Sequence, residues 1–306
     1  MQQLKTSNYP SNAFGRFWMK VPLVLRSILI GFGVSSLGVG IWTIVAISLP
    51  GPWSVLLMGT ILIFFWMYFS GKWKPVNTQA FRRFCIRETN LKKPVWIWGL
   101  VAAFFIVLFL HSSLILTFRI VEFQPEIFKT LSFINDVPAL QAWSAIIGIS
   151  MVAGICEEIG YRGYLQKPLE QKYGPIVAIS ISSIIFIVIH LHQAWLGSIM
   201  VSIIPISFMI GYLAYATNSL IPGIIAHVSF DIILSSYWWS DVIGTFEHKP
   251  ISMTGVDNHF IITVMVVLLS TVFFIVAIRK LLKFKMKDSE DFIQRTNMPK
   301  SAIMKT

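Results

Sequence analysis

The sequence is poor in charged residues. Only 13% of its 306 residues are Asp, Glu, Lys or Arg, while 55% are hydrophobic. A soluble globular domain carries about a quarter charged residues, which it needs to cover its surface with polar groups. The composition therefore excludes an ordinary soluble domain and predicts a protein whose main partner is the lipid bilayer.

Cysteine is also scarce. The chain holds two, Cys85 in a predicted basic loop and Cys156 inside a predicted span. Two such distant cysteines form neither a disulfide framework nor a Cys-x-x-Cys zinc site. Cys156 is also a poor nucleophile, because adjacent carboxylates and apolar surroundings disfavour the thiolate.

Internal repeats, low-complexity tracts and long linkers are missing as well. We therefore interpret residues 1–306 as a single membrane domain, with short soluble-looking segments at 71–93 and 284–306. The first apolar run is long and lacks a small-residue cleavage site, so we interpret it as a retained span rather than a signal peptide.

Long apolar runs are what the chain does have. A membrane-spanning helix needs about 20 mostly apolar residues. The runs that qualify predict an all-α, polytopic membrane helix bundle of about eight transmembrane helices, at 27–49, 53–70, 95–118, 142–165, 175–191, 196–216, 220–236 and 260–282. The first of these carries small residues at spacings that favour close helix packing, namely Gly31, Ser35, Gly38 and Gly40.

The net charge of +11 does not indicate a nucleic-acid partner. The basic residues flank predicted spans and show no aromatic-interleaved binding pattern. Basic residues gather in 72–93 and 279–287, whereas the loops after the third span and before the eighth are acidic. The positive-inside rule then predicts a cell-membrane protein, of the bacterial inner-membrane type, with both termini in the cytoplasm.

Ionisable residues inside the predicted spans are the candidate functional residues. An ionised side chain at the centre of a bilayer costs about 2.5–3.5 kcal/mol on insertion scales, so each one suggests a function. The predicted spans four to seven, residues 142–236, contain Glu157, Glu158, Arg162, His190, His227 and Asp231.

Helical spacing sorts these residues before any family is considered. Residues four apart share a helix face, so Arg162 is expected to pair with Glu158 and to leave Glu157 available for chemistry. By the same spacing Asp231 is expected to orient His227.

The predicted turn between spans four and five adds a prediction about depth. Glu157 precedes Tyr173 by about as many residues as His190 follows it. At about 1.5 Å rise per residue both side chains lie at a similar level in the membrane. A water molecule between Glu157 and His190 is therefore geometrically reasonable.

These residues form three ordered motifs: Glu157-Glu158-x-x-x-Arg162, Phe186-x-x-x-His190 and His227-x-x-x-Asp231. The pattern resembles the CAAX prenyl endopeptidase and bacteriocin-processing (CPBP) family, which includes the type II CAAX prenyl endopeptidases. The resemblance covers residues 157–231 and implies a metal-independent glutamate hydrolase with its catalytic core at 142–236.

The resemblance also implies residue roles. Glu157 becomes the general base, assisted by His190, and Glu158 with Arg162 holds the base in place. His227 with Asp231 is then expected to stabilise the oxyanion. The third motif commonly ends in Asn, and an amide donates a hydrogen bond that a carboxylate donates only when protonated. Asp231 therefore either carries a proton or serves only to orient His227.

Other functions remain open at this stage. Glu157, His190 and His227 could instead be zinc ligands with a bound water, although the His-Glu-x-x-His signature is missing. A proton-coupled transporter would also place carboxylates and histidines in a membrane, and a catalytically silent bacteriocin-immunity or binding protein could keep the fold. The endopeptidase hypothesis, with a membrane-associated or lipidated peptide as substrate, requires no cofactor.

Overall fold

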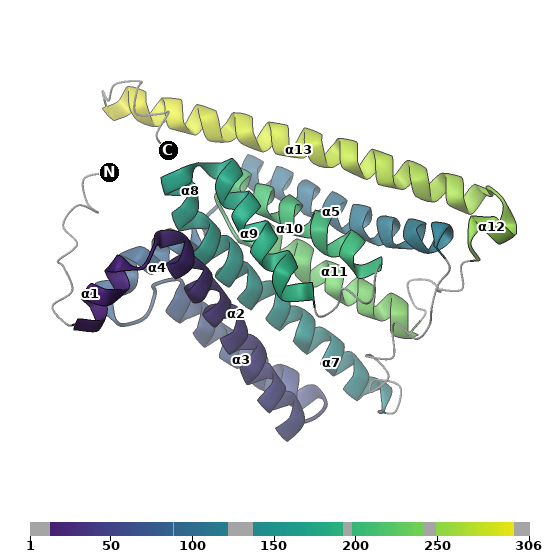
Figure 1. Ribbon diagram of the computed structural model, residues 1–306, viewed down its shortest axis with the longest axis horizontal. Coiled ribbons are helices and arrows are strands. Elements are labelled where there is room, and N and C mark those ends of the chain that lie inside the picture. The colour runs from purple at the N-terminus through teal and green to yellow at the C-terminus, as the bar shows by residue number, and fades with distance from the viewer. Residues whose placement is uncertain (1–12, 88, 122–136, 192–197, 241–248, 297–306) are drawn as a thin grey trace.

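The computed structural model describes residues 13–87, 89–121, 137–191, 198–240 and 249–296, and they are almost entirely helical (Figure 1). Its elements are α1 (Ala13–Lys20), α2 (Leu23–Ser48), α3 (Pro52–Phe69), the short 3-10 turn η2 (Val76–Thr78), α4 (Gln79–Ile86), α5 (Lys93–Ile120), α7 (Ala139–Val152), the π-helical segment η4 (Ala153–Gln166), α8 (Lys167–Tyr173), α9 (Pro175–Ile189), α10 (Ser198–Thr217), α11 (Ile221–Ser240), α12 (Ile251–Thr254) and α13 (Asn258–Thr296).

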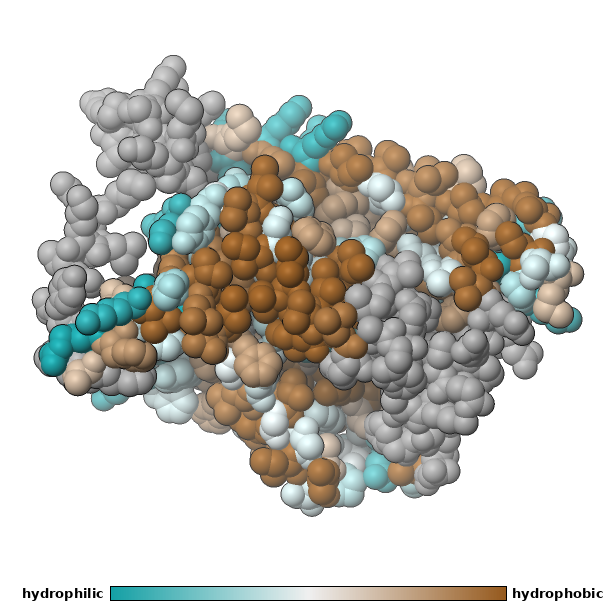
Figure 2. Space-filling model, viewed as in Figure 1, coloured by the Kyte–Doolittle hydropathy of each residue, from teal (hydrophilic) through white to brown (hydrophobic). Residues whose placement is uncertain are grey.

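Each of the eight predicted spans coincides with a helix. Five helices among the described residues are long and apolar enough to cross a membrane, with Ala139–Tyr173 counted as one, and three shorter apolar helices cover the other predicted spans. Figure 2 shows a broad hydrophobic surface across the middle of the molecule, and large apolar side chains such as Ile176 and Ile184 of α9 are exposed. The all-α, polytopic membrane bundle is confirmed.

The bundle has two connected parts (Figure 1). The longest helix, α13, lies along α5, and α10 and α11 also pack on α5, while α2 packs against η4. The short helices α1, α4 and α8 gather at one end of the molecule, and α12 lies at the opposite end. The segment η4 lies between the two parts, since it contacts both α2 and α11.

Small residues bring α2 and η4 close together, as the sequence predicted. A Cβ atom added at Gly31 would lie 2.8 Å from the Gly160 carbonyl oxygen, and one added at Gly38 would collide with the Cys156 sulfur. Ser35 is buried in the same contact. Gly40 does not take part, because nothing lies within 4 Å of its position.

The helix that carries the first motif differs from the expected regular α-helix. Residues Ala153–Gln166 form a π-helix, in which each N–H reaches back five residues rather than four. Such segments are rare in proteins, but those that occur often lie at functional sites. The apolar pattern of the sequence did not distinguish this register from an α-helix.

The segment at 71–93 is more ordered than a soluble loop. Cys85 lies in α4 and is fully buried, which corrects its predicted position in a basic loop. Burial raises the pKa of the Cys85 thiol far above its ordinary value. The nearby positive charges of Arg87 and Lys167 lower this pKa, but burial outweighs them. Two basic residues of this segment, Arg82 and Arg87, are also buried rather than facing solvent.

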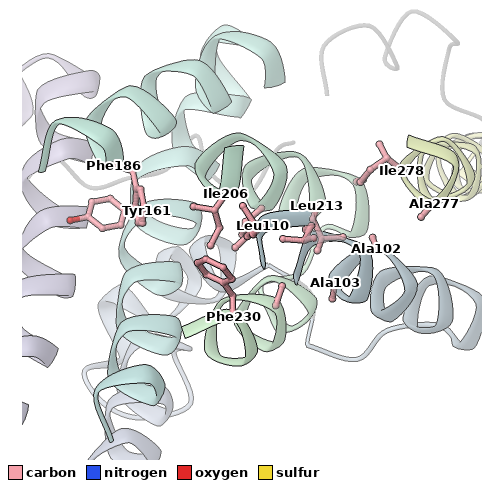
Figure 3. Packing of buried hydrophobic residues seen from close by; sticks show 14 of the residues in the cluster. Ala102, Ala103, Leu110, Tyr161, Phe186, Ile206, Leu213, Phe230, Ala277 and Ile278 are labelled. Carbon is pink, nitrogen blue, oxygen red and sulfur yellow. The ribbon is translucent and has the colours of Figure 1, made fainter. Parts of the chain in front are cut away.

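The main hydrophobic core extends from the motif region to the long C-terminal helix. Figure 3 shows it running from Tyr161 and Phe186, through Ile206 and Phe230, to Ile278 of α13. This packing fixes η4, α9, α10 and α11 relative to one another, so side chains on these elements keep defined separations.

Candidate active site

The first motif forms the expected ion pair. Arg162 Nη1 lies 3.3 Å from Glu158 Oε1, and both side chains are almost completely buried. The Arg162 guanidinium also stacks 4.5 Å from the centre of the Phe186 ring. The pair is thereby held from two elements, η4 and α9.

His227 joins this pair in a way that helical spacing did not predict. Its Nδ1 atom lies 2.9 Å from Glu158 Oε1. Because the Arg162-paired carboxylate of Glu158 can only accept, Nδ1 donates the hydrogen bond. Glu158 therefore orients the His227 ring, a role that the sequence assigned to Asp231.

Asp231 still lies beside His227, although farther away than a hydrogen bond. Its Oδ2 atom is 3.7 Å from His227 Nε2, beyond the 2.7–3.2 Å range that is normal for a nitrogen donor and an oxygen acceptor. The two residues thus share a face of α11, as the spacing of four predicted, without direct bonding.

Glu157 faces His190 across the gap between η4 and α9. Glu157 Oε2 lies 3.9 Å from His190 Nε2, which agrees with the similar membrane depth predicted for the two residues. His190 Nδ1 lies 2.7 Å from the Phe186 carbonyl oxygen. Since a carbonyl only accepts, Nδ1 donates, and in a neutral ring Nε2 would then be the acceptor nitrogen.

Phe186 is the common support of the site. Its ring stacks on His190 with centroids 4.3 Å apart and meets Tyr161 edge-on at 5.4 Å. With Arg162 on it as well, this single side chain positions members of the first two motifs. The contact between Phe186 and His190 agrees with their spacing of four residues.

Exposure divides the site into two layers. The side chains of Glu158, Arg162 and His227 are 0%, 1% and 6% exposed. Glu157, His190 and Asp231 are 12%, 16% and 25% exposed. The second set is therefore more accessible to water than the first.

The arrangement does not resemble a metal centre in the part of the chain that the structure describes. No group of three or more His, Cys, Asp or Glu side chains there is placed to hold a metal ion. Zinc binding by Glu157, His190 and His227 stays a prediction. Its difficulty is that His227 uses Nδ1 on Glu158 and turns Nε2 towards Asp231.

Several polar contacts escaped the sequence analysis. Arg87 binds both Glu170 and the Arg162 carbonyl, and its partners lie too far along the chain for helical spacing to reveal them. His259, to which no role was assigned, lies 3.0 Å from Arg119.

Comparison with known protein families gives one match. Residues 139–233 match the model of the type II CAAX prenyl endopeptidase Rce1-like family. No curated protein and no solved structure matches the chain. The matched segment contains the three motifs, so the match supports the resemblance to the CPBP family over this part of the chain.

Proposed function

We propose that this membrane protein, with its Rce1-like domain at residues 139–233, is an endopeptidase that hydrolyses membrane-associated or lipidated peptides using water activated by Glu157 and His190. The observation that carries the proposal is the position of these two side chains. They face each other at 3.9 Å and are more exposed than the ion pair beneath them.

The separation suits one water molecule. At 3.9 Å the Glu157 carboxylate and His190 Nε2 are too far apart to bond directly, and polar groups at such a distance are commonly bridged by water. Both groups are acceptors, so one water can donate one O–H to each. Its lone pairs then point away from both and towards a substrate carbonyl.

The hydrolytic step follows from this placement. The water oxygen forms a bond to the scissile carbonyl carbon while Glu157 takes a proton from the water. The C–N bond then breaks, and Glu157 returns the proton to the leaving amine. General base and acid catalysis of this kind contributes about 10²–10⁴-fold in rate.

The buried layer supplies fixed charge and orientation. Arg162 and His227 both bind Glu158 Oε1. These contacts connect η4 to α11 at the residue next to Glu157. Glu158 and Arg162 therefore act in this proposal as positioning residues and do not touch the substrate.

His227 and Asp231 are the proposed oxyanion donors. With Nδ1 donating to Glu158, a neutral His227 would turn the lone pair of Nε2 towards the Asp231 carboxylate at 3.7 Å. Two acceptors that face each other repel, so one proton belongs on either Nε2 or Asp231. That proton supplies the hydrogen bond which an Asn amide would otherwise provide.

The test is cleavage of a fluorogenic membrane-peptide library by purified protein in detergent. We expect the wild type to cleave a subset of peptides and Glu157→Gln to lose about 10²–10⁴-fold in rate. The matched control is Asp257→Asn, which removes the charge of a carboxylate that lies outside the motifs and pairs with Arg119. Thermal melting of all three proteins shows that they are folded.

Three further outcomes decide against the proposal. Full activity of Glu157→Gln would remove Glu157 as the base. Loss of wild-type activity with a chelator, restored by added Zn²⁺, would favour the metal mechanism. Cleavage by neither protein, combined with ion-coupled uptake in proteoliposomes, would favour a transporter.

A further inference from the structure

The hydrogen-bond spacing of the helix changes at the end of η4. The π-helix ends at Gln166, and α8 continues from Lys167. The Lys167 N–H bonds to the Gly163 carbonyl, four residues back, as in an α-helix. The Arg162 carbonyl lies one residue before Gly163, at this change of spacing.

The Arg87 side chain binds the carbonyl at this change of spacing. Arg87 Nε and Nη2 donate to the Arg162 carbonyl oxygen at 3.2 and 3.0 Å. The Arg87 side chain is 0% exposed. A hydrogen bond from a charged donor contributes about 1.5–3 kcal/mol, so this contact stabilises η4 at the residue where its hydrogen-bond spacing changes.

Arg87 is itself held from several elements. Its Nη2 and Nη1 atoms donate to the two oxygens of Glu170 on α8 at 2.7 and 3.0 Å, and Nη1 also reaches the carbonyl of Ala214 on α10. Its backbone, with a φ of 65°, pairs with Ser219 before α11. All five N–H groups of the guanidinium are aimed at acceptors, an arrangement that lysine cannot reproduce.

The Gln166 side chain also binds Glu170, and we call Arg87, Glu170 and Gln166 together the clamp. Its Nε2 atom donates to Glu170 Oε1 at 2.7 Å and to the Gly211 carbonyl at 3.0 Å. Glu170 is therefore fixed between Arg87 and Gln166, and both of these residues contact α10. The clamp connects α8, α10 and the end of η4.

We propose that Arg87 is a positioning residue that fixes the π-helical register of η4 and so the placement of Glu157 and Glu158. Its effect on catalysis rests on the proposed peptidase function. Arg162 is the residue at which the two systems meet, because its backbone is bound by Arg87 and its side chain by Glu158. Without the clamp, η4 can relax to an α-helical register, which rotates Glu157 relative to His190.

The experiment compares Arg87→Lys with Arg119→Lys. Arg119 is a matched control, since it is also buried and binds a carboxylate, Asp257, at 2.7 Å, but it joins α5 to α13. Both variants keep the charge and lose the forked geometry. Cleavage kinetics and backbone hydrogen exchange across residues 153–166 are measured on the full-length protein.

We expect Arg87→Lys to lower kcat by about 10- to 100-fold, the loss expected from a displacement of about 1 Å, with KM changed by less than about 2-fold. Amides of η4 should exchange about 10-fold faster, because the hydrogen bonds from the Arg87 side chain to the Arg162 carbonyl are weakened. Arg119→Lys should change neither quantity. Should lysine prevent folding, Arg87→Gln is the second variant, with the same acceleration expected.

Normal η4 exchange in a folded Arg87 variant would overturn the proposal. So would equal acceleration in Arg119→Lys, which would indicate general loosening of the bundle. If the wild type cleaves no peptide, the proposed function fails, but the exchange measurement still tests the clamp. The two failures are therefore distinguishable.

Discussion

Two adjacent glutamates have opposite surroundings in this protein. Glu158 is sealed and bound by Arg162 and His227, whereas Glu157 is partly exposed and faces His190. A buried carboxylate that loses its partner costs about 3–5 kcal/mol, so Glu158 is suited to structural positioning. Glu157, reached by water, is suited to chemistry. Burial thus assigns different tasks to chemically identical neighbours.

Asp231 provides a prediction at the residue scale. If its part is to supply a hydrogen bond with His227, Asp231→Asn should retain activity within about 10-fold, because an amide can donate. Asp231→Ala should lose about 10²–10³-fold, the usual cost of removing an oxyanion donor. Steady-state kinetics of the two variants check this, and equal loss in both would show that the carboxyl group itself is required.

At the scale of elements, α2 packs closely against η4, the helix that carries Glu157 and Glu158. The backbones approach closely at Gly31 and Gly160 because neither carries a side chain. In a membrane such close approach is a main source of helix association, since burial of apolar surface from water does not contribute. The π-helix therefore rests on a rigid neighbour.

Gly31 and Gly33 provide a matched pair for testing this contact. A Cβ atom at Gly31 would lie 2.8 Å from the Gly160 carbonyl oxygen, whereas nothing lies within 4 Å of Gly33. We expect Gly31→Ala to destabilise the protein by about 1–3 kcal/mol through overpacking. Gly33→Ala should be neutral or stabilising by roughly 0.5–1 kcal/mol. Thermal melting in detergent compares them, and an equal response would argue against the close contact.

At the scale of the whole molecule, charge predicts the orientation in the membrane. Basic residues gather at 72–93 and 279–287, and α4 and α8 lie at one end of the bundle with α12 at the other (Figure 1). The acidic residue Asp257 lies beside α12, where the hydrogen bond from Arg119 holds the pKa of its carboxyl below the ordinary value. We propose that the α4 end faces the cytoplasm, with both termini.

Labelling of single cysteines tests this orientation. Val76 and Met253 are each 71% exposed, one beside α4 and the other in α12. A membrane-impermeant maleimide should modify Met253→Cys in intact cells and Val76→Cys only after lysis. The native Cys85 and Cys156 are buried, so their background should be low. The reverse labelling pattern would invert the proposed topology.

The sequence alone determined the parts of this protein that depend on local rules. The eight apolar runs were recognisable because a bilayer sets the length of each span. The pairing of Arg162 with Glu158 and the proximity of Asp231 to His227 followed from a spacing of four residues. The ordered motifs at 157–231 also predicted a family resemblance, which the match of residues 139–233 confirmed. The catalytic roles stay predictions until the variants are measured.

Only the tertiary structure decided how these local pieces act together. The bond from His227 to Glu158 joins residues 69 apart, and the bond from Arg87 to the Arg162 carbonyl joins residues 75 apart. No spacing rule reaches that far, because such contacts depend on which helix faces pack. The π-helical register has the same origin. Arg87, which binds the Arg162 carbonyl near the end of η4, is brought there only by folding.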